Sequence, residues 1–286
     1  MNGAALVEAR GLGKSYPLVF RSRDRLRALW RLLLGRVDAD AVSVLRNVDL
    51  RVERGQSLGL IGENGAGKST LMNLVYGFHP ADSVEILVQG RTVEIRTPQA
   101  AIAVGIGMVH QHFMLVENFT VLENVVLGVE GGARLAGGLA KARAELTRLA
   151  DDYGLGVPLD TVVSELPVGL QQRVEILKAL YRRAEILILD EPTAVLTPQE
   201  TDQLFKMLGR LRDEGKAVIL VTHKLREIMA ITDRVTVMRQ GAVVHETATA
   251  ATSLRALAEQ MVGRAVLLHV DKTAARPGEV LLSARE

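Results

Sequence analysis

Short apolar runs alternate along the chain with stretches whose apolar residues recur at helical spacing. Three runs, at 57–61, 186–189 and 217–221, are almost wholly apolar and lead into glycine-rich or polar segments. Continuous apolar strands are typical of a parallel sheet covered by helices on both faces, and such sheets bind ligands beyond the carboxyl ends of their strands. The pattern therefore predicts an α/β fold with its site along that edge.

Two further segments have the pattern of β-hairpins. Residues 84–88 and 92–95 flank a turn at Gln89-Gly90-Arg91, and residues 234–238 and 242–247 flank a turn at Gln240-Gly241. Apolar and β-branched runs joined by such short turns favour paired antiparallel strands. Both hairpins are predicted to form an antiparallel β layer beside the parallel core.

Residues 118–181 are predicted to form a helical subdomain inserted in this core. Within them, 135–153 is rich in alanine, leucine and charged residues, and 171–181 places its apolar side chains on one helical face. A separate basic amphipathic helix is predicted at about 21–35, with leucines and Trp30 on one face and arginines spaced four apart. Such a helix either packs on its own domain, which is the more common case, or lies on a membrane or an acidic partner.

Composition narrows the class of protein. The 286 residues are 48% hydrophobic and 3% aromatic with no cysteine, which excludes a disordered chain, a disulfide scaffold and an iron–sulfur protein. Without cysteine nothing marks a secreted scaffold, so a cytosolic location is expected by default. Apolar stretches such as 101–109 are far shorter than the roughly 18 residues needed to span a bilayer, and the first ten residues lack a signal-peptide pattern. With 35 basic against 33 acidic residues and few aromatics, no nucleic-acid partner is expected.

A phosphate-binding motif follows the first apolar run. Residues 62–70 read G-E-N-G-A-G-K-S-T, which satisfies G-x-x-x-x-G-K-[ST] between a predicted strand and a predicted helix. Glycines let the backbone N–H groups wrap a phosphate at the helix start, where the helix dipole favours an anion. Lys68 is expected to reach the β- and γ-phosphates of a nucleotide, and the Ser69 hydroxyl is expected to bind Mg²⁺.

Two carboxylates complete this arrangement at the end of the run 186–189. Asp190 is placed to hold the Mg²⁺ shell, and Glu191 is placed to orient or deprotonate an attacking water. An Asp-Glu pair after a strand is by itself usually only a helix N-terminal charge. Together with the phosphate loop it predicts hydrolysis of a nucleoside triphosphate.

With these motifs the chain resembles the nucleotide-binding domain of ATP-binding cassette (ABC) transporters over residues 1–268. The resemblance implies a P-loop NTPase fold, with a RecA-like parallel core, an antiparallel β subdomain and an inserted helical subdomain. It makes Gln111, in the run 107–113, the Q-loop glutamine that links the metal site to the membrane subunit, and His223 the switch histidine on the γ-phosphate. Glu191, His223 and Gln111 are thus the expected catalytic residues, and Ser69, Gln111 and Asp190 the expected metal residues. The expected ATP-binding residues are Tyr16, which would stack on adenine, Gly62, Asn64, Gly65, Ala66, Gly67, Lys68, Ser69, Thr70 and Gly169.

The signature motif departs from the family. The usual Leu-Ser-Gly-Gly-Gln is L-P-V-G-L at 166–170, followed by a well-matched Gln171-Gln172-Arg173, and Thr197 stands where the family has the D-loop aspartate. Pro167 suits the first turn of a helix but brings no hydroxyl to the γ-phosphate of an opposing domain. Gly169 and the helix dipole remain.

These departures resemble the first cassette of tandem ATPases that serve simple-sugar and nucleoside importers. Residues 269–286 are interpreted as a linker and the possible start of a second cassette, because 281–286 echoes 6–10. The extension at 21–35, however, resembles one in ATPases of polysaccharide exporters. It also leaves open whether Tyr16 or Phe20 meets the adenine.

The resemblance implies an ATP-hydrolysing subunit, with ATP and Mg²⁺ as cofactors, that energises import of a simple sugar or nucleoside. Its expected partners are transmembrane permease subunits, a second ATP-binding cassette and, indirectly, an extracytoplasmic substrate-binding protein. The expected location is the cytoplasmic face of the membrane. The alternatives are an exporter-type ATPase and a soluble cassette ATPase acting on ribosomes or DNA, which the basic helix favours. A non-hydrolytic binding module would lack Lys68, Ser69, Asp190 or Glu191, and all four are present.

Overall fold

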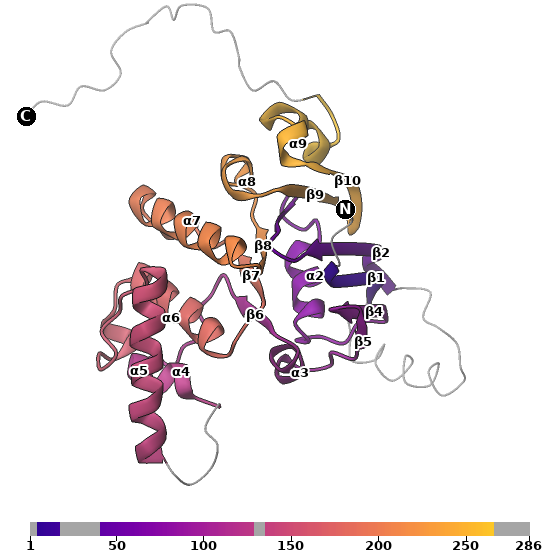
Figure 1. Cartoon of the computed structure of the whole chain (residues 1–286). Coiled ribbons are helices and arrows are strands. Elements are labelled where there is room, and N and C mark those ends of the chain that lie inside the picture. The colour runs from indigo at the N-terminus through magenta and orange to yellow at the C-terminus, as the bar shows by residue number, and fades with distance from the viewer. Residues whose placement is uncertain (1–4, 18–40, 129–134, 266–286) are drawn as a thin grey trace, which may run out of the picture.

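The computed structural model describes residues 5–17, 41–128 and 135–265 (Figure 1). These residues form two β-sheets and the helices that pack around them. The predicted basic helix at 21–35 and the predicted linker at 269–286 lie outside the described residues. Of the helices within the described ranges, none is both long enough and apolar enough to cross a bilayer.

The larger sheet has six strands in the order β10-β9-β3-β8-β7-β6. Its strands are β3 (Ser57–Ile61), β6 (Ile106–Val109), β7 (Ile186–Asp190), β8 (Ala217–Val221), β9 (Arg234–Arg239) and β10 (Ala242–Ala248). The five strands from β9 to β6 run parallel, and every residue of β3, β6, β7 and β8 is buried. This confirms the parallel core predicted from the apolar runs.

The smaller sheet is antiparallel, in the order β2-β1-β4-β5. Its strands are β1 (Ala5–Pro17), β2 (Ala41–Glu53), β4 (Ser83–Val88) and β5 (Arg91–Val93). The predicted hairpin at 84–95 forms here. The prediction that the second hairpin joins the same layer is wrong, because β9 pairs in parallel with β3 and only β10 runs antiparallel to its neighbour. Burial on both faces explains this: Val235, Val237 and Met238 are completely buried and need cover on either side of the strand.

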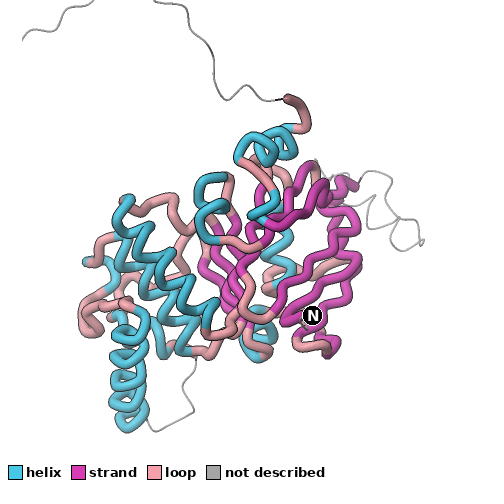
Figure 2. Tube along the Cα trace, turned by 45° about the horizontal axis from the view of Figure 1, so that its top comes forward, coloured by secondary structure: helices cyan, strands magenta, loops and turns pink. Residues whose placement is uncertain are grey.

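Helices cover the larger sheet and extend beyond one of its edges (Figures 1 and 2). They are α2 (Lys68–Val75), α3 (Pro98–Ala103), α4 (Val121–Val126), α5 (Leu135–Tyr153), α6 (Val168–Tyr181), α7 (Pro198–Asp213), α8 (Leu225–Ile231) and α9 (Leu254–Val262), with 3₁₀ turns at Val163–Glu165 and Thr249–Ala251. In both views α4, α5 and α6 gather together, away from the antiparallel sheet. The helix predicted at 135–153 is α5, whereas the limits 118–181 of a subdomain stay a prediction.

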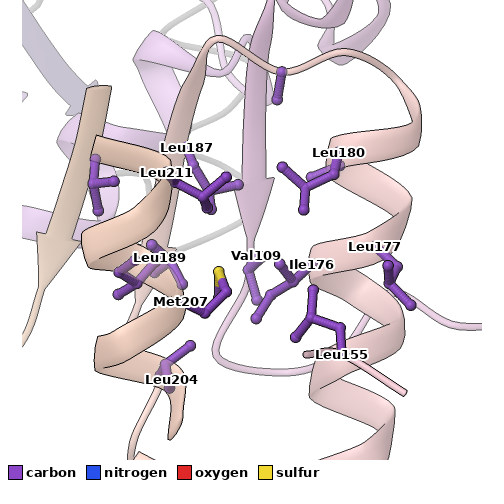
Figure 3. Close-up of a cluster of buried hydrophobic side chains, with 14 of the residues drawn as sticks. Val109, Leu155, Ile176, Leu177, Leu180, Leu187, Leu189, Leu204, Met207 and Leu211 are labelled. Carbon is purple, nitrogen blue, oxygen red and sulfur yellow. The ribbon is translucent and has the colours of Figure 1, made fainter. Parts of the chain in front are cut away.

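Alternate residues of each central strand enter two different cores. Leu187 and Leu189 of β7 belong to a cluster with α6 and α7, and Ile186 and Ile188 belong to a second cluster with α2 and the antiparallel sheet. Side chains alternate across a strand, so both faces must be apolar for both cores to form. Figure 3 shows the first cluster, in which Met207 of α7 and Ile176 of α6 approach Val109 of β6 from opposite sides. The resulting rigid sheet fixes the positions of its carboxyl-terminal ends.

Candidate functional site

The phosphate-binding loop connects β3 to α2 at the carboxyl edge of the larger sheet. Gly65 and Gly67 have φ angles of 80° and 100°, a left-handed region that favours glycine. Gly67 is the N-cap residue of α2, and its φ brings the backbone into the helix without a side-chain cap. The loop thus presents its N–H groups at a helix N-terminus, where an anion binds.

Neighbouring strands approach this loop closely at two of its glycines, by backbone at Gly62 and by a side chain at Gly67. A Cβ on Gly62 would lie 2.4 Å from the Met238 carbonyl oxygen, and one on Gly67 would lie 2.7 Å from Leu45 Cδ2. The N–H of Gly241, in the β9–β10 turn, donates to the Ala66 carbonyl at 3.0 Å. Strands from both sheets therefore hold the loop in place.

Lys68 is buried beneath the loop, with 7% of its surface exposed. Its Nζ donates hydrogen bonds to the carbonyl oxygens of Gly62 at 2.8 Å and Glu63 at 3.2 Å. Burial lowers the pKa of Lys68, and the nearby carboxylates of Glu191 and Asp190 partly oppose this. The ammonium group is therefore held in position by neutral carbonyl groups, which a phosphate anion can replace.

Asp190 ends β7 and is 6% exposed. Burial raises the pKa of Asp190, while a hydrogen bond from the Ser69 hydroxyl and the charge of Lys68 act in the opposite direction. Its Oδ1 atom is fully buried and has no hydrogen-bond partner. A buried carboxylate oxygen without a partner requires an explanation, and a cation bound beside Ser69 supplies one.

Glu191 adopts a left-handed backbone conformation with φ of 49°, and its N–H donates to the Val221 carbonyl at 2.8 Å. One carboxylate oxygen lies 2.8 Å from His223 Nδ1. The other accepts a hydrogen bond from the Thr222 hydroxyl at 3.3 Å. The ends of β7 and β8 together therefore fix this side chain, and Thr222 is a contact that the motifs did not reveal.

A cleft of about 410 Å³ brings most of the predicted residues together. Residues from four strand ends line it: Asn64, Gly65, Ala66, Gly67, Lys68, Ser69, Thr70, Gln111, Glu191, Ala194 and His223. Gly62 and Asp190 adjoin this lining through Lys68 and Ser69. The convergence follows from the parallel sheet, whose strands β3, β6, β7 and β8 all end at this edge.

Two of the predicted residues, Tyr16 and Gly169, neither line the cleft nor adjoin its lining. Tyr16 is an exposed residue of β1 with Lys14 Nζ 5.4 Å from its ring centroid. Gly169 lies in the first turn of α6, where a Cβ would meet Glu200 Oε1 of α7. Their assigned contacts with adenine and with the nucleotide of an opposing domain stay predictions.

The start of α6 differs from the expectation for proline. The helix begins at Val168, so Pro167 is its N-cap residue rather than part of its first turn, and no side chain caps the helix. Thr197, which stands at the D-loop position, is the N-cap residue of α7 and forms reciprocal hydrogen bonds with Glu200. The sequence T-x-x-E is a capping-box signal, so the role of Thr197 could have been found from sequence.

The carboxyl half of α6 holds the segment that follows Gln111. Lys178 Nζ donates to the Met114 carbonyl at 2.9 Å and pairs with Glu175, which is 2% exposed, at 3.0 Å. Arg182 donates to the Leu127 carbonyl at 2.7 Å. Helical periodicity marks α6 but carries no signal for these long-range contacts, and sequence reasoning missed them.

The predicted metal residues include one carboxylate. Within residues 5–17, 41–128 and 135–265, no group of three or more histidine, aspartate or glutamate side chains is placed to hold a metal ion. Ser69 and Asp190 offer hard oxygen donors, which Mg²⁺ prefers while keeping several waters. Such a site suits a cation that arrives with phosphate oxygens of a nucleotide.

The fold and the cleft define a P-loop nucleotide-binding protein with a parallel α/β core. The family model described as ABC transporter matches residues 45–194, more than half of the chain. The chain is 49% identical over 267 residues to the glucose import ATP-binding protein TsgD13 of Haloferax volcanii, covering 84% of this chain and 48% of that protein. It belongs to the ABC transporter family.

Further relatives agree with this assignment. The nucleoside import ATP-binding protein NupA of Lactococcus lactis is 47% identical, covering 84% of this chain and 47% of the relative. A ribose import ATP-binding protein, RbsA of Chromobacterium violaceum, is 42% identical, covering 84% of this chain and 48% of the relative. The chain thus spans about half the length of these curated relatives. A solved ATP-binding cassette in its ADP conformation has the same fold, with a TM-score of 0.69 at 21% identity over 91% of this chain and 97% of that one.

Proposed function

We propose that this chain binds ATP with Mg²⁺ and hydrolyses the γ-phosphate. The observation that carries the proposal is the Glu191–His223 contact, which stands beside the phosphate loop in a single cleft. A phosphate loop alone supports nucleotide binding. A carboxylate fixed next to it, with a histidine as partner, supplies the group that activates water.

The residues of the cleft have separate roles in binding and hydrolysis. Lys68 exchanges its two carbonyl partners for β- and γ-phosphate oxygens, and the N–H groups of the loop hold the remaining phosphate charge. Glu191 orients and deprotonates the attacking water, while His223 contacts the γ-phosphate. Phosphoryl transfer needs little covalent assistance, so positioning and electrostatic stabilisation supply most of the rate.

Ser69 and Asp190 would hold Mg²⁺, and Gln111 lines the same cleft. The unpartnered Oδ1 of Asp190 supports this assignment. When bound, Mg²⁺ neutralises developing charge on the phosphate oxygens. The Ser69 hydroxyl keeps the Asp190 carboxylate oriented toward the start of α2.

We further propose that ATP hydrolysis energises import of a simple sugar or nucleoside. The support is the similarity to relatives that are import ATP-binding proteins for glucose, nucleosides and ribose. The partners are then transmembrane permease subunits and, indirectly, an extracytoplasmic substrate-binding protein, and the chain lies peripherally on the cytoplasmic face. The relatives favour this reading over an exporter ATPase or one acting on ribosomes or DNA.

The nucleotide site is completed by a second ATP-binding cassette, in tandem or as a dimer. The relatives are about twice as long as this chain, which is the length a second cassette needs. Tyr16 and Gly169 would then meet adenine and the opposing nucleotide. Pro167 would face the nucleotide held by the opposing cassette, and it offers that nucleotide no hydroxyl or N–H. We therefore propose that only the site built on the phosphate loop of this chain turns over.

Two variants of the assembled transporter test these proposals. Glu191→Gln is expected to bind ATP normally and to lose at least about 100-fold in kcat, because the amide cannot accept a proton from water. Lys68→Ala is expected to abolish both ATP binding at this site and steady-state hydrolysis. Normal turnover by Glu191→Gln would contradict the role of the carboxylate, and hydrolysis that survives Lys68→Ala would refute a single active site.

A further inference from the structure

A second set of side chains joins the loop after Glu191 to the loop that carries His223. Thr193 lies in the segment between β7 and α7 and is 2% exposed. Lys224 directly follows His223 and is the N-cap residue of α8, and Glu227 lies in the first turn of that helix. None of these three residues belongs to the cleft lining.

The three side chains form a closed set of polar contacts. Lys224 Nζ donates to the Thr193 carbonyl oxygen at 3.0 Å and lies 3.0 Å from the Thr193 hydroxyl oxygen. That hydroxyl donates its own proton to Glu227 Oε1 at 2.5 Å. Glu227 and Lys224 also form an ion pair at 3.3 Å. The ammonium group thus bridges backbone and side chain of the opposite loop, and the three residues are called the brace below.

The brace continues to the proposed catalytic base through Thr222. The N–H of Lys224 donates to the Thr222 hydroxyl oxygen at 3.1 Å, and this hydroxyl donates to Glu191 Oε2 at 3.3 Å. The other oxygen of Glu191 contacts His223. The backbone of Lys224 is therefore linked directly to both partners of the Glu191 carboxylate, by a hydrogen bond to Thr222 and by the peptide bond to His223.

Two features indicate that the brace positions catalytic side chains rather than stabilising the fold. The Glu227 side chain is only 12% exposed, and its buried Oε2 atom has no hydrogen-bond partner. Replacing a buried charged network by apolar side chains is often neutral or stabilising, so an incompletely paired network is weak evidence for stability. In addition, Glu191 holds a left-handed φ of 49° without being glycine, a strain that persists only where the surroundings over-determine it.

We propose that Thr193, Lys224 and Glu227 are positioning residues that keep Glu191 and His223 in the arrangement needed for hydrolysis. The inference rests on the proposed ATPase function. The phosphate loop has its own contacts to β9 and β2, so the brace is expected to affect the chemical step and not ATP binding. A misplacement of about 1 Å is enough to reduce the rate about 100-fold.

The test compares Thr193→Val with Thr193→Ser in the full-length protein, measuring ATPase kcat, KM and the affinity for ATP. Valine keeps the shape of threonine but removes the hydroxyl, whereas serine keeps it. We expect valine to lower kcat about tenfold or more with KM changed less than about threefold, and serine to restore kcat to within about threefold. Thr147→Val is the control, because it removes the hydrogen bond from the Thr147 hydroxyl to the Arg143 carbonyl, on the exposed face of α5.

Lys224→Met and Lys224→Arg repeat the test at the partly exposed end of the brace, should valine at 193 prevent folding. Arginine can still donate to Thr193, so it is expected to recover most of the activity lost with methionine. A purely structural role would lower the melting temperature and leave kcat per folded molecule unchanged. Wild-type kcat in Thr193→Val and Lys224→Met, or an equal loss of ATP affinity, would overturn the brace alone. Absence of ATPase activity in the wild-type protein would overturn the proposed function itself, and the brace with it.

Discussion

Gly241 joins the phosphate loop to both sheets, and its replacement by alanine gives a measurable test of that packing. The turn Gln240-Gly241 between β9 and β10 has φ angles of 50° and 78°. Both values are positive, as a two-residue type I′ hairpin turn requires. Gly241 donates to the Ala66 carbonyl at 3.0 Å and accepts from the Arg46 N–H at 2.8 Å. A Cβ here would lie 2.1 Å from the Val44 carbonyl oxygen.

A matched control exists in the same chain. Gln89-Gly90 between β4 and β5 has nearly the same φ angles, 51° and 74°, but a Cβ on Gly90 would meet nothing within 4 Å. Gly90→Ala therefore introduces only the left-handed strain, about 1 kcal/mol. Gly241→Ala adds overlap with backbone, about 2 kcal/mol more, because a side chain forced into packed surroundings displaces them. We expect losses in the free energy of unfolding of about 1 and about 3 kcal/mol.

Chemical denaturation of both variants and the wild type measures these losses, and ATP binding reports on the loop. Gly241→Ala is expected to weaken ATP binding as well, because β2 or the turn must move and the turn is bonded to Ala66. Gly90→Ala should bind ATP as the wild type does. Equal losses of stability in the two variants, or unchanged ATP affinity in Gly241→Ala, would refute the claim that Gly241 fixes the phosphate loop.

Two further predictions concern titratable groups at the end of β6 and in α6. Burial and the nearby Lys178 lower the pKa of His110 to about 4 from 6.5, so between these pH values the unfolded chain binds a proton that the native protein does not. Stability should fall as pH drops from 6.5 toward 4, and His110→Gln should flatten this slope in denaturation midpoints measured at several pH values. Lys178→Met leaves the buried Glu175 unpaired and should cost about 3–5 kcal/mol of unfolding free energy. Adding Glu175→Gln should recover most of that loss, and an unchanged deficit in the double variant would contradict the buried ion pair.

Local patterns were sufficient for most of the fold and for the phosphate loop. The runs 57–61, 186–189 and 217–221 form strands β3, β7 and β8 because a strand buried on both faces needs apolar residues at every position. The motif at 62–70 follows β3 and continues into the first turn of α2, as its glycines and lysine predicted. These strands and this loop depend on residues that are close together in sequence, so periodicity and motif spacing were enough to predict them.

The tertiary structure decided how those elements meet. It assigned β9 to the parallel core, because its two buried faces require neighbours that the hairpin pattern does not specify. Helix α6 begins one residue after Pro167, and Lys178 near its other end holds Met114. It also brought His223 against Glu191 and Lys224 against Thr193, pairs that lie 32 and 31 positions apart. Such contacts follow from the order and direction of strands in the sheet, and a hydrogen bond between distant loops leaves no local periodicity in the sequence.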